Sequence, residues 1–167
     1  MPTANSSASV IGTCFFCKLP SDAFLFRSKY FSVKLDDHPA TFGHALVISN
    51  EHYPHIQDLP SEAGTDMLYV MQKAMDLLCD TTLITNHYEQ IVAESTDTIS
   101  IQYCKQALHN ARPITAGQDY TIGINNGPDS GQTIPHLHIH LMPRHKGDGG
   151  VQEGGVRSVF INRTTYK

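Results

Sequence analysis

Three histidines alternate with apolar residues in one short run of the chain, residues 136–142 (HLHIHLM), and the whole chain carries ten histidines among 167 residues. Successive side chains of a strand point to opposite faces, so a strand here places three imidazoles on one face and three aliphatic side chains in a core behind it. The alternative is that the three histidines have no catalytic role and form a solvated strand face or an adventitious metal-binding face. The polar residues 131–133 just ahead of the run favour a functional row.

Further strand and helix patterns surround this run. Strands are predicted at residues 23–26, 31–35, 45–48, 119–125 and 135–142, from alternating apolar residues at 31–35 and 136–142 and from strand-like apolar segments elsewhere. An amphipathic helix is predicted from about residue 59 to residue 80, because apolar residues there recur at spacings of three and four. A second helix is expected at 99–111, ahead of Pro113, whereas residues 81–98 are polar and poorly periodic. Residues 156–161 are expected to form one more strand or an extended arm.

The order of these segments predicts the fold class. Strands before and after a helical excursion are typical of an α+β domain, here an antiparallel sheet of five or more strands with a helix packed on one face. Residues 1–12 are mostly small and polar and are expected to form a disordered tail. Residues 13–167 are then long enough for one domain with its own core.

Composition excludes several functional classes. A net charge of -4 and a pI near 6.2 do not provide the basic face of a dedicated nucleic-acid-binding protein. No apolar run approaches the roughly 20 residues of a membrane-spanning helix, and residues 1–10 lack the apolar core of a signal peptide. We therefore expect a soluble cytoplasmic protein with no nucleic acid and no membrane among its partners. Four cysteines in this setting argue against a disulfide scaffold.

His138 is the candidate nucleophile, because it stands in the middle of the histidine row. A neutral imidazole near pH 7 is both a good nucleophile toward phosphorus and a proton carrier, and a strand fixes its orientation. Its two histidine neighbours can bind phosphate oxygens or move a proton. Gly127 and residues 131–133 (GQT) add backbone and side-chain donors, and this combination suits a phosphate group.

Residues 131–144 (GQTIPHLHIHLMPR) resemble the signature of the histidine triad (HIT) family of nucleotide hydrolases and transferases. Residues 43–48 (GHALVI) are similar to the family's Gly-His-x-Leu-Val-Ile strand, and residues 14–17 (CFFC) to its N-terminal cysteine pair. The resemblance covers most of residues 14–59 and 119–161.

Two departures from the family pattern are visible. The resemblance is silent over roughly residues 80–118, which look like an insertion relative to shorter members. Ser49 and Asn50 stand where the family usually has Pro-Lys after the Leu-Val-Ile strand.

The resemblance implies a two-step mechanism. His138 attacks the α-phosphate of a nucleotide, a covalent nucleotidyl-histidine forms as the leaving group departs, and water then releases the nucleoside monophosphate. Four side chains would hold the phosphate oxygens: Asn125, Gln132, Thr133 and His140. His136 completes the triad, and His44 would support it from a neighbouring strand, although a buried His44 without a chemical role is the alternative. Transferase branches commonly carry Gln at the place of His140, so this chain favours hydrolysis.

Asp36 is the candidate contact for the ribose. It stands eight residues before His44, where the family places an acidic or amide residue that binds the ribose hydroxyls. A carboxylate suits a cis-diol because it only accepts hydrogen bonds. The alternative is an Asp that caps the turn ahead of Pro39.

Cys14 and Cys17 supply half of a tetrahedral zinc site, since two closely spaced thiolates are typical zinc ligands. The resemblance implies that His52 and His136 supply the other half, with His55 as a competitor for the place of His52. Such a site would be structural and would tie the N-terminal segment to the histidine strand. Two reduced, buried thiols are the alternative. The two other cysteines are expected to be ordinary buried thiols: Cys79 and Cys104.

The leading hypothesis is a homodimeric nucleotide hydrolase that cleaves a nucleoside phosphoanhydride, in particular a dinucleoside polyphosphate. A group of nearby cations favours an extended polyphosphate over a small amine leaving group: Arg144, His145, Lys146 and Arg157. The alternatives are an adenosine phosphoramidate hydrolase, a nucleotide-binding regulatory protein with little turnover, and a zinc-dependent hydrolase that uses the triad as metal ligands.

Overall fold

The computed structural model describes residues 13–148, so the tail predicted at 1–12, the strand or arm at 156–161 and Arg157 lie outside the described residues. The strands are β1 (Phe26–Arg27), β2 (Phe31–Leu35), β3 (Ala45–Ser49), β4 (Asp119–Gly123) and β5 (His138–Arg144). The α-helices are α2 (Ala63–Leu78), α3 (Thr81–Glu94) and α4 (Thr98–His109). Short 3-10 turns are η1 (Phe16–Lys18), η2 (Ser21–Ala23), η3 (Ile56–Asp58) and η4 (Pro128–Ser130).

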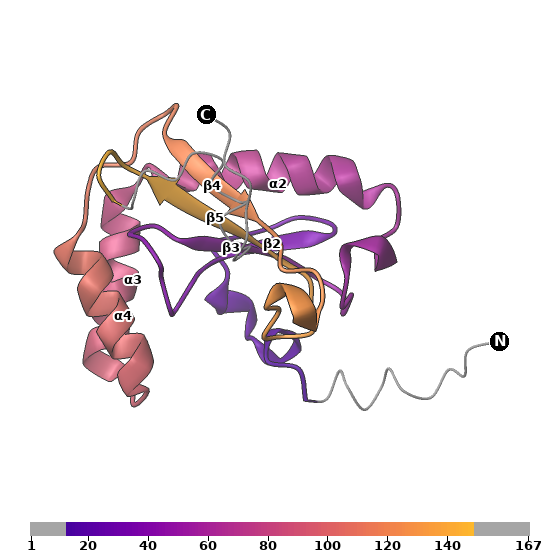
Figure 1. Cartoon of the computed structure of the whole chain (residues 1–167), viewed down its shortest axis with the longest axis horizontal. Coiled ribbons are helices and arrows are strands. Elements are labelled where there is room, and N and C mark those ends of the chain that lie inside the picture. Colours follow the sequence, from indigo (N-terminus) through magenta and orange to yellow (C-terminus); the bar gives the residue numbers. More distant parts are fainter. Residues whose placement is uncertain (1–12, 149–167) are drawn as a thin grey trace.

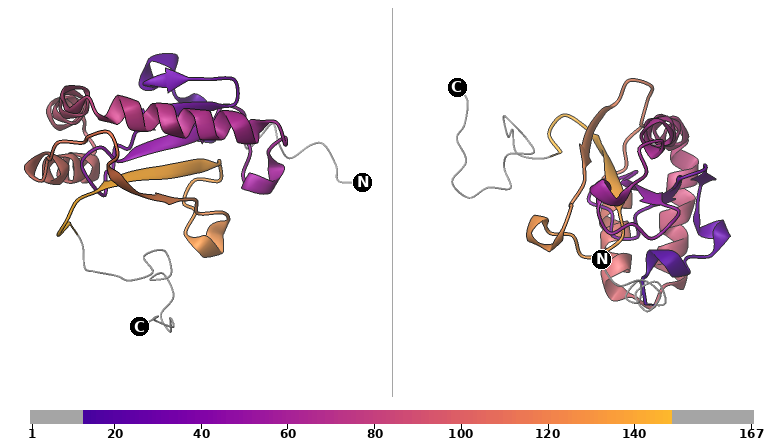
Figure 2. Two further views of the ribbon diagram at one scale, coloured as in Figure 1. Left: turned by 90° about the horizontal axis from the view of Figure 1, so that it is seen from above. Right: turned by 90° about the vertical axis from the view of Figure 1, so that its right-hand side faces the viewer.

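The five strands form one antiparallel sheet in the order β1-β2-β3-β5-β4. The histidine strand β5 is therefore central, between β3 and β4, although β3 and β5 are far apart in the sequence. Helix α2 lies along the sheet, and α3 and α4 stand together at one end of it (Figures 1 and 2). This arrangement confirms the predicted α+β class with an antiparallel sheet. Within the described residues, no helix is long and apolar enough to cross a bilayer.

The two faces of the sheet have different coverings. On one face, buried aliphatic side chains of β2, β3 and β5 join α2 in the main core, as Val33, Val47 and Ile139 do with Val70. On the other face lie the alternate residues of the same strands. There Leu46 stands opposite His140, in a register that also places Ile48 opposite His138. The histidines therefore lie on the face away from α2.

Helix α3 corrects the sequence prediction, which expected no helix over residues 81–98. The Asp80 side chain caps its start by accepting hydrogen bonds from the backbone N–H groups of Thr82 and Leu83, at 3.1 and 3.2 Å. Ile84 and Tyr88, one turn apart, are fully buried in the main core. The helix is stabilised by this narrow buried stripe, which the surrounding polar residues hide in the sequence.

Two strand predictions also need correction. Of residues 23–26 only Phe26 belongs to a strand, because the chain turns in η2 after Pro20 and pairs with β2 at β1. Strand β5 begins at His138 and not at residue 135, since the N–H of Leu137 donates to the Tyr53 carbonyl at 2.6 Å, outside the strand ladder. His136 therefore lies just ahead of the histidine strand.

Candidate functional site

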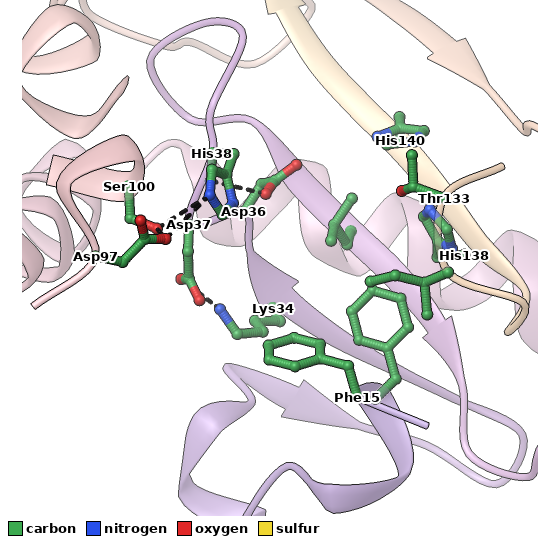
Figure 3. A pocket seen from close by; sticks show the side chains of 13 residues that line it. Phe15, Lys34, Asp36, Asp37, His38, Asp97, Ser100, Thr133, His138 and His140 are labelled. Atoms are coloured by element: carbon green, nitrogen blue, oxygen red, sulfur yellow. Dashed lines mark hydrogen bonds and ion pairs between the residues drawn. The ribbon is translucent and has the colours of Figure 1, made fainter. Parts of the chain in front are cut away.

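A cavity of about 510 Å³ opens on the histidine face of the sheet (Figure 3). Its walls come from the N-terminal segment, β2 and the turn after it, β3, the start of α4, and the segment that leads into β5. The lining residues are Phe15, Phe16, Lys34, Asp36, Asp37, His38, Leu46, Asp97, Ser100, Thr133, Ile134, His138 and His140.

His138 is held in one orientation and one tautomer. Its Nδ1 lies 2.7 Å from the carbonyl oxygen of His136. A carbonyl can only accept a hydrogen bond, so Nδ1 carries the ring proton and Nε2 keeps its lone pair. The ring of Phe16 packs edge-on against His138, with 5.1 Å between centroids. His138 thus brings an unprotonated, positioned nitrogen to the cavity.

His44 and His140 form a second histidine pair. The backbone N–H of Ala40 donates to His44 Nδ1 at 3.1 Å, so the proton of the neutral His44 ring is on Nε2. That nitrogen lies 3.0 Å from His140 Nδ1 and donates to it. His140, which lines the cavity, then carries its own proton on Nε2. This chain of hydrogen bonds gives the cavity an N–H donor beside the nucleophile.

Burial keeps these rings neutral near pH 7. Desolvation lowers the pKa of His44 to about 4, against the attraction of Asp36 and with some repulsion from His140 and His138. Desolvation also lowers the pKa of His140, with repulsion from His138 as a further cause. The pKa of His136 is lowered as well, mainly by burial. Neutral neighbours place no repelling positive charge beside the nucleophilic imidazole when it becomes cationic.

The opposite side of the cavity is charged. Asp36 Oδ1 accepts a hydrogen bond from the N–H of His38 at 2.9 Å, and its Oδ2 lies 3.3 Å from His44 Nδ1. Lys34 is buried and pairs with Asp37 at 2.5 Å. Burial raises the pKa of Asp37, but the hydrogen bond from His87 and the charge of Lys34 outweigh it, so its pKa is lowered and it is ionised.

The structure brings some of the predicted nucleotide-binding residues to the cavity and not others. Thr133 and Asp36 line it. Asn125 is not among the lining residues, and neither is Gln132. The Gln132 side chain accepts from the Gly127 N–H and donates to the Pro54 carbonyl, both at 2.8 Å, so it fixes the loop ahead of the histidine strand.

Sequence reasoning missed several lining residues. Lys34 could have been found, because the two-residue period of β2 places it on the same face as Ser32 and as the histidines of β5. Asp97 could have been recognised as an N-cap but not as a cavity residue, since only packing brings α4 to the turn after β2. Phe15 and Phe16 stand inside the predicted cysteine pair, where no period identifies a function.

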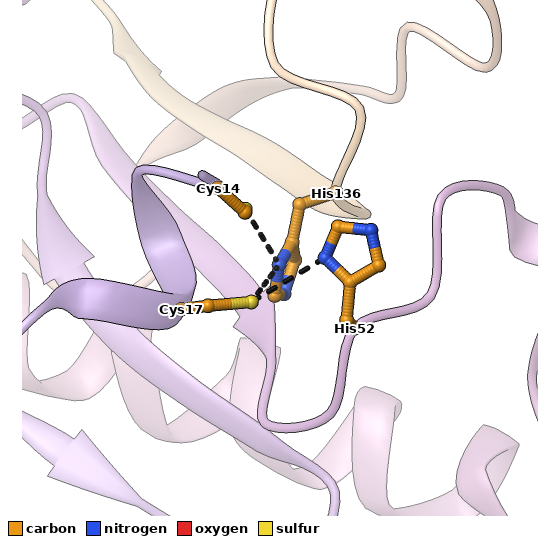
Figure 4. A group of neighbouring side chains, drawn as sticks. All are labelled: Cys14, Cys17, His52 and His136. Atoms are coloured by element: carbon orange, nitrogen blue, oxygen red, sulfur yellow. Dashed lines mark hydrogen bonds between the residues drawn. The ribbon is translucent and has the colours of Figure 1, made fainter. Parts of the chain in front are cut away.

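Four potential metal ligands meet beside the cavity (Figure 4). Cys14 Sγ and Cys17 Sγ both lie 3.5 Å from His136 Nδ1, and Cys17 Sγ lies 3.3 Å from His52 Nδ1. All four ligand atoms lie within 4.8 Å of one another. His55 stays outside the group, because it caps η3 together with Asp58.

The donor set fits zinc. A tetrahedral ion with Zn–S near 2.3 Å and Zn–N near 2.1 Å spaces its ligands by roughly 3.3–3.8 Å. Three of the distances between these atoms are 3.3–3.5 Å, and the others are within 4.8 Å. His136 Nε2 donates to the Ser49 carbonyl at 2.7 Å, which leaves Nδ1 free to ligate. Burial, with Cys14 alongside, raises the pKa of Cys17 to about 11, so this thiol would release its proton to solvent only when a metal ion takes its place.

The remaining cysteines differ from each other. Cys104 is buried, as predicted, whereas Cys79 is exposed near the C-terminal end of α2 and corrects the prediction. The hypothesis of a triad that binds one catalytic zinc does not match the geometry. The two ligand groups found among residues 13–148 each take one triad histidine, and neither includes His138.

Known proteins resemble this chain along most of its length. The bis(5'-nucleosyl)-tetraphosphatase (asymmetrical) of Schizosaccharomyces pombe is 27% identical over 135 residues, which are 80% of this chain and 56% of that protein. The adenosine 5'-monophosphoramidase of Saccharomyces cerevisiae is 26% identical over 157 residues, 90% of this chain and 74% of that protein. The chain thus spans only about half the length of the first of these relatives.

A solved structure supports the fold. A hypothetical protein from Leishmania major superposes with a TM-score of 0.55 at 22% identity, over 93% of this chain and 84% of that chain. The family model of the HIT domain matches residues 19–147, which include every strand and α-helix described above. Since that match takes in far more than half of the sequence, the chain belongs to the HIT domain family.

Proposed function

We propose that the protein is a nucleotide hydrolase that works through a covalent nucleotidyl-histidine at His138. The observation that carries this proposal is the hydrogen bond between His138 Nδ1 and the His136 carbonyl, because it leaves Nε2 unprotonated at the cavity. A neutral, oriented imidazole is a suitable nucleophile for phosphorus.

The reaction has two displacements. In the first, the Nε2 lone pair of His138 forms a bond to the α-phosphorus, and the bond from phosphorus to the leaving group breaks with its electron pair on that group. In the second, water attacks the same phosphorus and loses a proton to solvent, the P–N bond breaks with its electron pair on Nε2, and the nucleoside monophosphate leaves with His138 restored. Each displacement is easier than a direct attack by water.

Neighbouring groups would stabilise the charge that develops on the phosphate oxygens. The Nε2–H of His140, held by His44, and the hydroxyl of Thr133 are the donors that line the cavity. Asn125 and Gln132 remain proposed phosphate contacts, which a bound nucleotide would have to draw toward the cavity. Asp36 would accept hydrogen bonds from the ribose hydroxyls.

The first substrate candidate is a dinucleoside polyphosphate, the class named for the Schizosaccharomyces pombe relative. The second is an adenosine phosphoramidate, the class named for the Saccharomyces cerevisiae relative. One observation favours the second: Arg144 is ion-paired with Asp148 at 2.9 Å, so its charge is not free for a polyphosphate. Side-by-side kcat/KM values on the two substrates decide between them.

We also propose a homodimer and a structural zinc site. The homodimer rests on the family resemblance. The zinc would be held by Cys14, Cys17, His52 and His136, where it would brace the chain ahead of His138 and take no part in the reaction.

Replacement of His138 tests the mechanism. His138→Asn should keep the fold, since the side chain faces the cavity and not the main core, and should lower turnover by at least about a thousandfold. Wild-type protein mixed with substrate labelled at the α-phosphorus and quenched in base should carry one acid-labile label per chain, and His138→Asn should carry none. His109→Asn, at an exposed position of α4, is the matched control. A His138→Asn protein with a tenth of wild-type turnover would rule out the covalent route.

A further inference from the structure

His38, in the turn after β2, contacts three side chains at the start of α4. Its Nε2 lies 3.2 Å from Ser100 Oγ and 3.3 Å from Asp97 Oδ2. Ser100 Oγ donates to Asp97 Oδ2 at 2.7 Å, so the two α4 side chains form one hydrogen-bonded unit. The ring of Tyr103 packs edge-on against His38, with 5.9 Å between centroids. Figure 3 shows His38, Asp97 and Ser100 together at the end of the cavity away from His138 and His140.

His38 in turn holds Asp36. The backbone N–H of His38 donates to Asp36 Oδ1 at 2.9 Å, while Asp36 Oδ2 lies 3.3 Å from His44 Nδ1. A continuous path of contacts therefore runs from α4, through His38, to Asp36. Asp36 is the carboxylate placed between the α4 end of the cavity and the histidines.

Helices α3 and α4 also contact Asp37, the residue between Asp36 and His38. The carboxylate of Asp37 contacts His87 Nε2 of α3 at 3.2 Å, and its carbonyl oxygen lies 3.6 Å from Cys104 Sγ of α4. Residues 36–38 are thus fixed on one side by the two helices that the family resemblance did not cover. A carboxylate on a fixed turn loses less conformational entropy on binding two hydroxyl groups than a carboxylate on a mobile turn does.

We propose that Asp97 and Ser100 are positioning residues for the nucleoside: they fix His38, whose backbone N–H orients the Asp36 carboxylate toward a ribose diol. This inference rests on the proposed function, which supplies the nucleotide. It assigns a role to the region 80–118, which supplies one wall of the cavity and sets the geometry of the ribose contact. Asp97 and Ser100 need not touch the reacting phosphorus.

Equilibrium binding of two nucleotides separates this role from a merely structural one. Ser100→Ala should weaken the binding of AMP by about three- to tenfold in isothermal titration calorimetry, because the hydrogen bond that fixes His38 is lost and the His38 N–H then orients Asp36 less well. The same variant should bind 2′,3′-dideoxy-AMP within about twofold of wild type, since that nucleotide has no diol for Asp36 to accept from. In turnover, KM should rise for ribonucleotide substrates while kcat changes little.

A pair of substitutions at His38 keeps the test independent of α4 stability. His38→Phe retains a ring for Tyr103 but no nitrogen, and should behave like Ser100→Ala. His38→Gln retains an N–H donor for Asp97 and Ser100 and should restore AMP binding. Gln102→Ala, at an exposed position of α4, is the matched control and should bind both nucleotides as wild type does.

Two results would overturn the inference in distinguishable ways. If Ser100→Ala and His38→Phe weaken AMP and its dideoxy analogue equally, or weaken neither, α4 does not act through the ribose contact, and the proposed hydrolase is untouched. If wild-type protein binds neither nucleotide, the nucleotide assignment of the cavity fails, and this inference fails with it.

Discussion

His44 shows how burial of one side chain adjusts the chemistry of its neighbours. It is 4% exposed, and its two ring nitrogens face Ala40 and Asp36 on one side and His140 on the other. Desolvation lowers its pKa from 6.5 to about 4, with Asp36 opposing and the other histidines adding to the shift. A neutral His44 donates to His140, and this fixes the proton of His140 on the nitrogen that can serve a phosphate oxygen.

The same pKa shift predicts a pH dependence of stability. Between pH 6.5 and pH 4 the unfolded chain takes up a proton at His44 that the folded chain does not, so the free energy of unfolding is largest above pH 6.5 and falls as the pH decreases toward 4. In His44→Asn, the free energy of unfolding should depend less steeply on pH in this window. The slope should fall by at most about 1.4 kcal/mol per pH unit, which is the contribution of one proton. Urea unfolding at several pH values measures it. Parallel curves for wild type and variant would contradict the shift.

Gly43 governs how β3 is entered from the preceding turn. Its φ is +83°, a left-handed conformation that side chains other than glycine rarely adopt. A Cβ there would stand 2.6 Å from Ile114 Cδ1 and 3.3 Å from Ile84 Cδ1. Ile114 and Ile84 are both buried, so either methyl group would have to shift within the core. The glycine thus lets α3 and the 114 segment close over the start of β3, next to His44.

Gly43→Ala should therefore be destabilising for two reasons, backbone strain and overpacking. We expect a loss of about 2–4 kcal/mol in the free energy of unfolding, as the sum of a left-handed alanine and a crowded methyl group. Gly117→Ala is the matched control, because Gly117 has φ +85° but no atom within 4 Å of the added Cβ, so it should lose only about 1–2 kcal/mol. Equal losses in the two variants, measured by urea unfolding, would show that Ile114 yields without cost.

Sequence reasoning succeeded where an element carries its own pattern. Strands β2 and β5 alternate apolar residues with polar ones and β3 is a short apolar run, so these strands and the histidine row were predictable. Helix α3 was not, since its buried stripe holds few residues and its cap at Asp80 adds one local signal. The contact between His38 and Ser100 joins residues 62 positions apart, and no local pattern contains that pairing.

At the scale of the whole molecule, the cysteine–histidine group joins the N-terminal segment, which belongs to no strand, to the chain beside the paired strands β3 and β5. Cys14 and Cys17 belong to the N-terminal segment, His52 follows β3, and His136 leads into β5. The same N-terminal segment contributes Phe15 and Phe16 to the cavity wall, with Phe16 packed on His136 and His138. A bound zinc ion would fix this wall of the cavity to the sheet, because its ligands come from both.

The last prediction concerns this zinc. Purified protein should contain about one zinc per chain, and Cys17→Ser should lose it together with about 5 °C or more of thermal stability, because the ion binds the folded chain only. Cys79→Ser is the matched control: its thiol is exposed at the C-terminal end of α2, lies 3.5 Å from the Met75 carbonyl oxygen, and is not one of the four ligands, so the change should leave zinc content and melting temperature unchanged. Metal analysis by mass spectrometry and thermal unfolding with and without a strong chelator provide both readouts.

Since the four ligands hold the N-terminal wall and not the nucleophile itself, chelation should lower the melting temperature of His138→Asn by the same amount as that of wild type. Metal-free protein with the full melting temperature would instead make Cys14 and Cys17 ordinary reduced thiols.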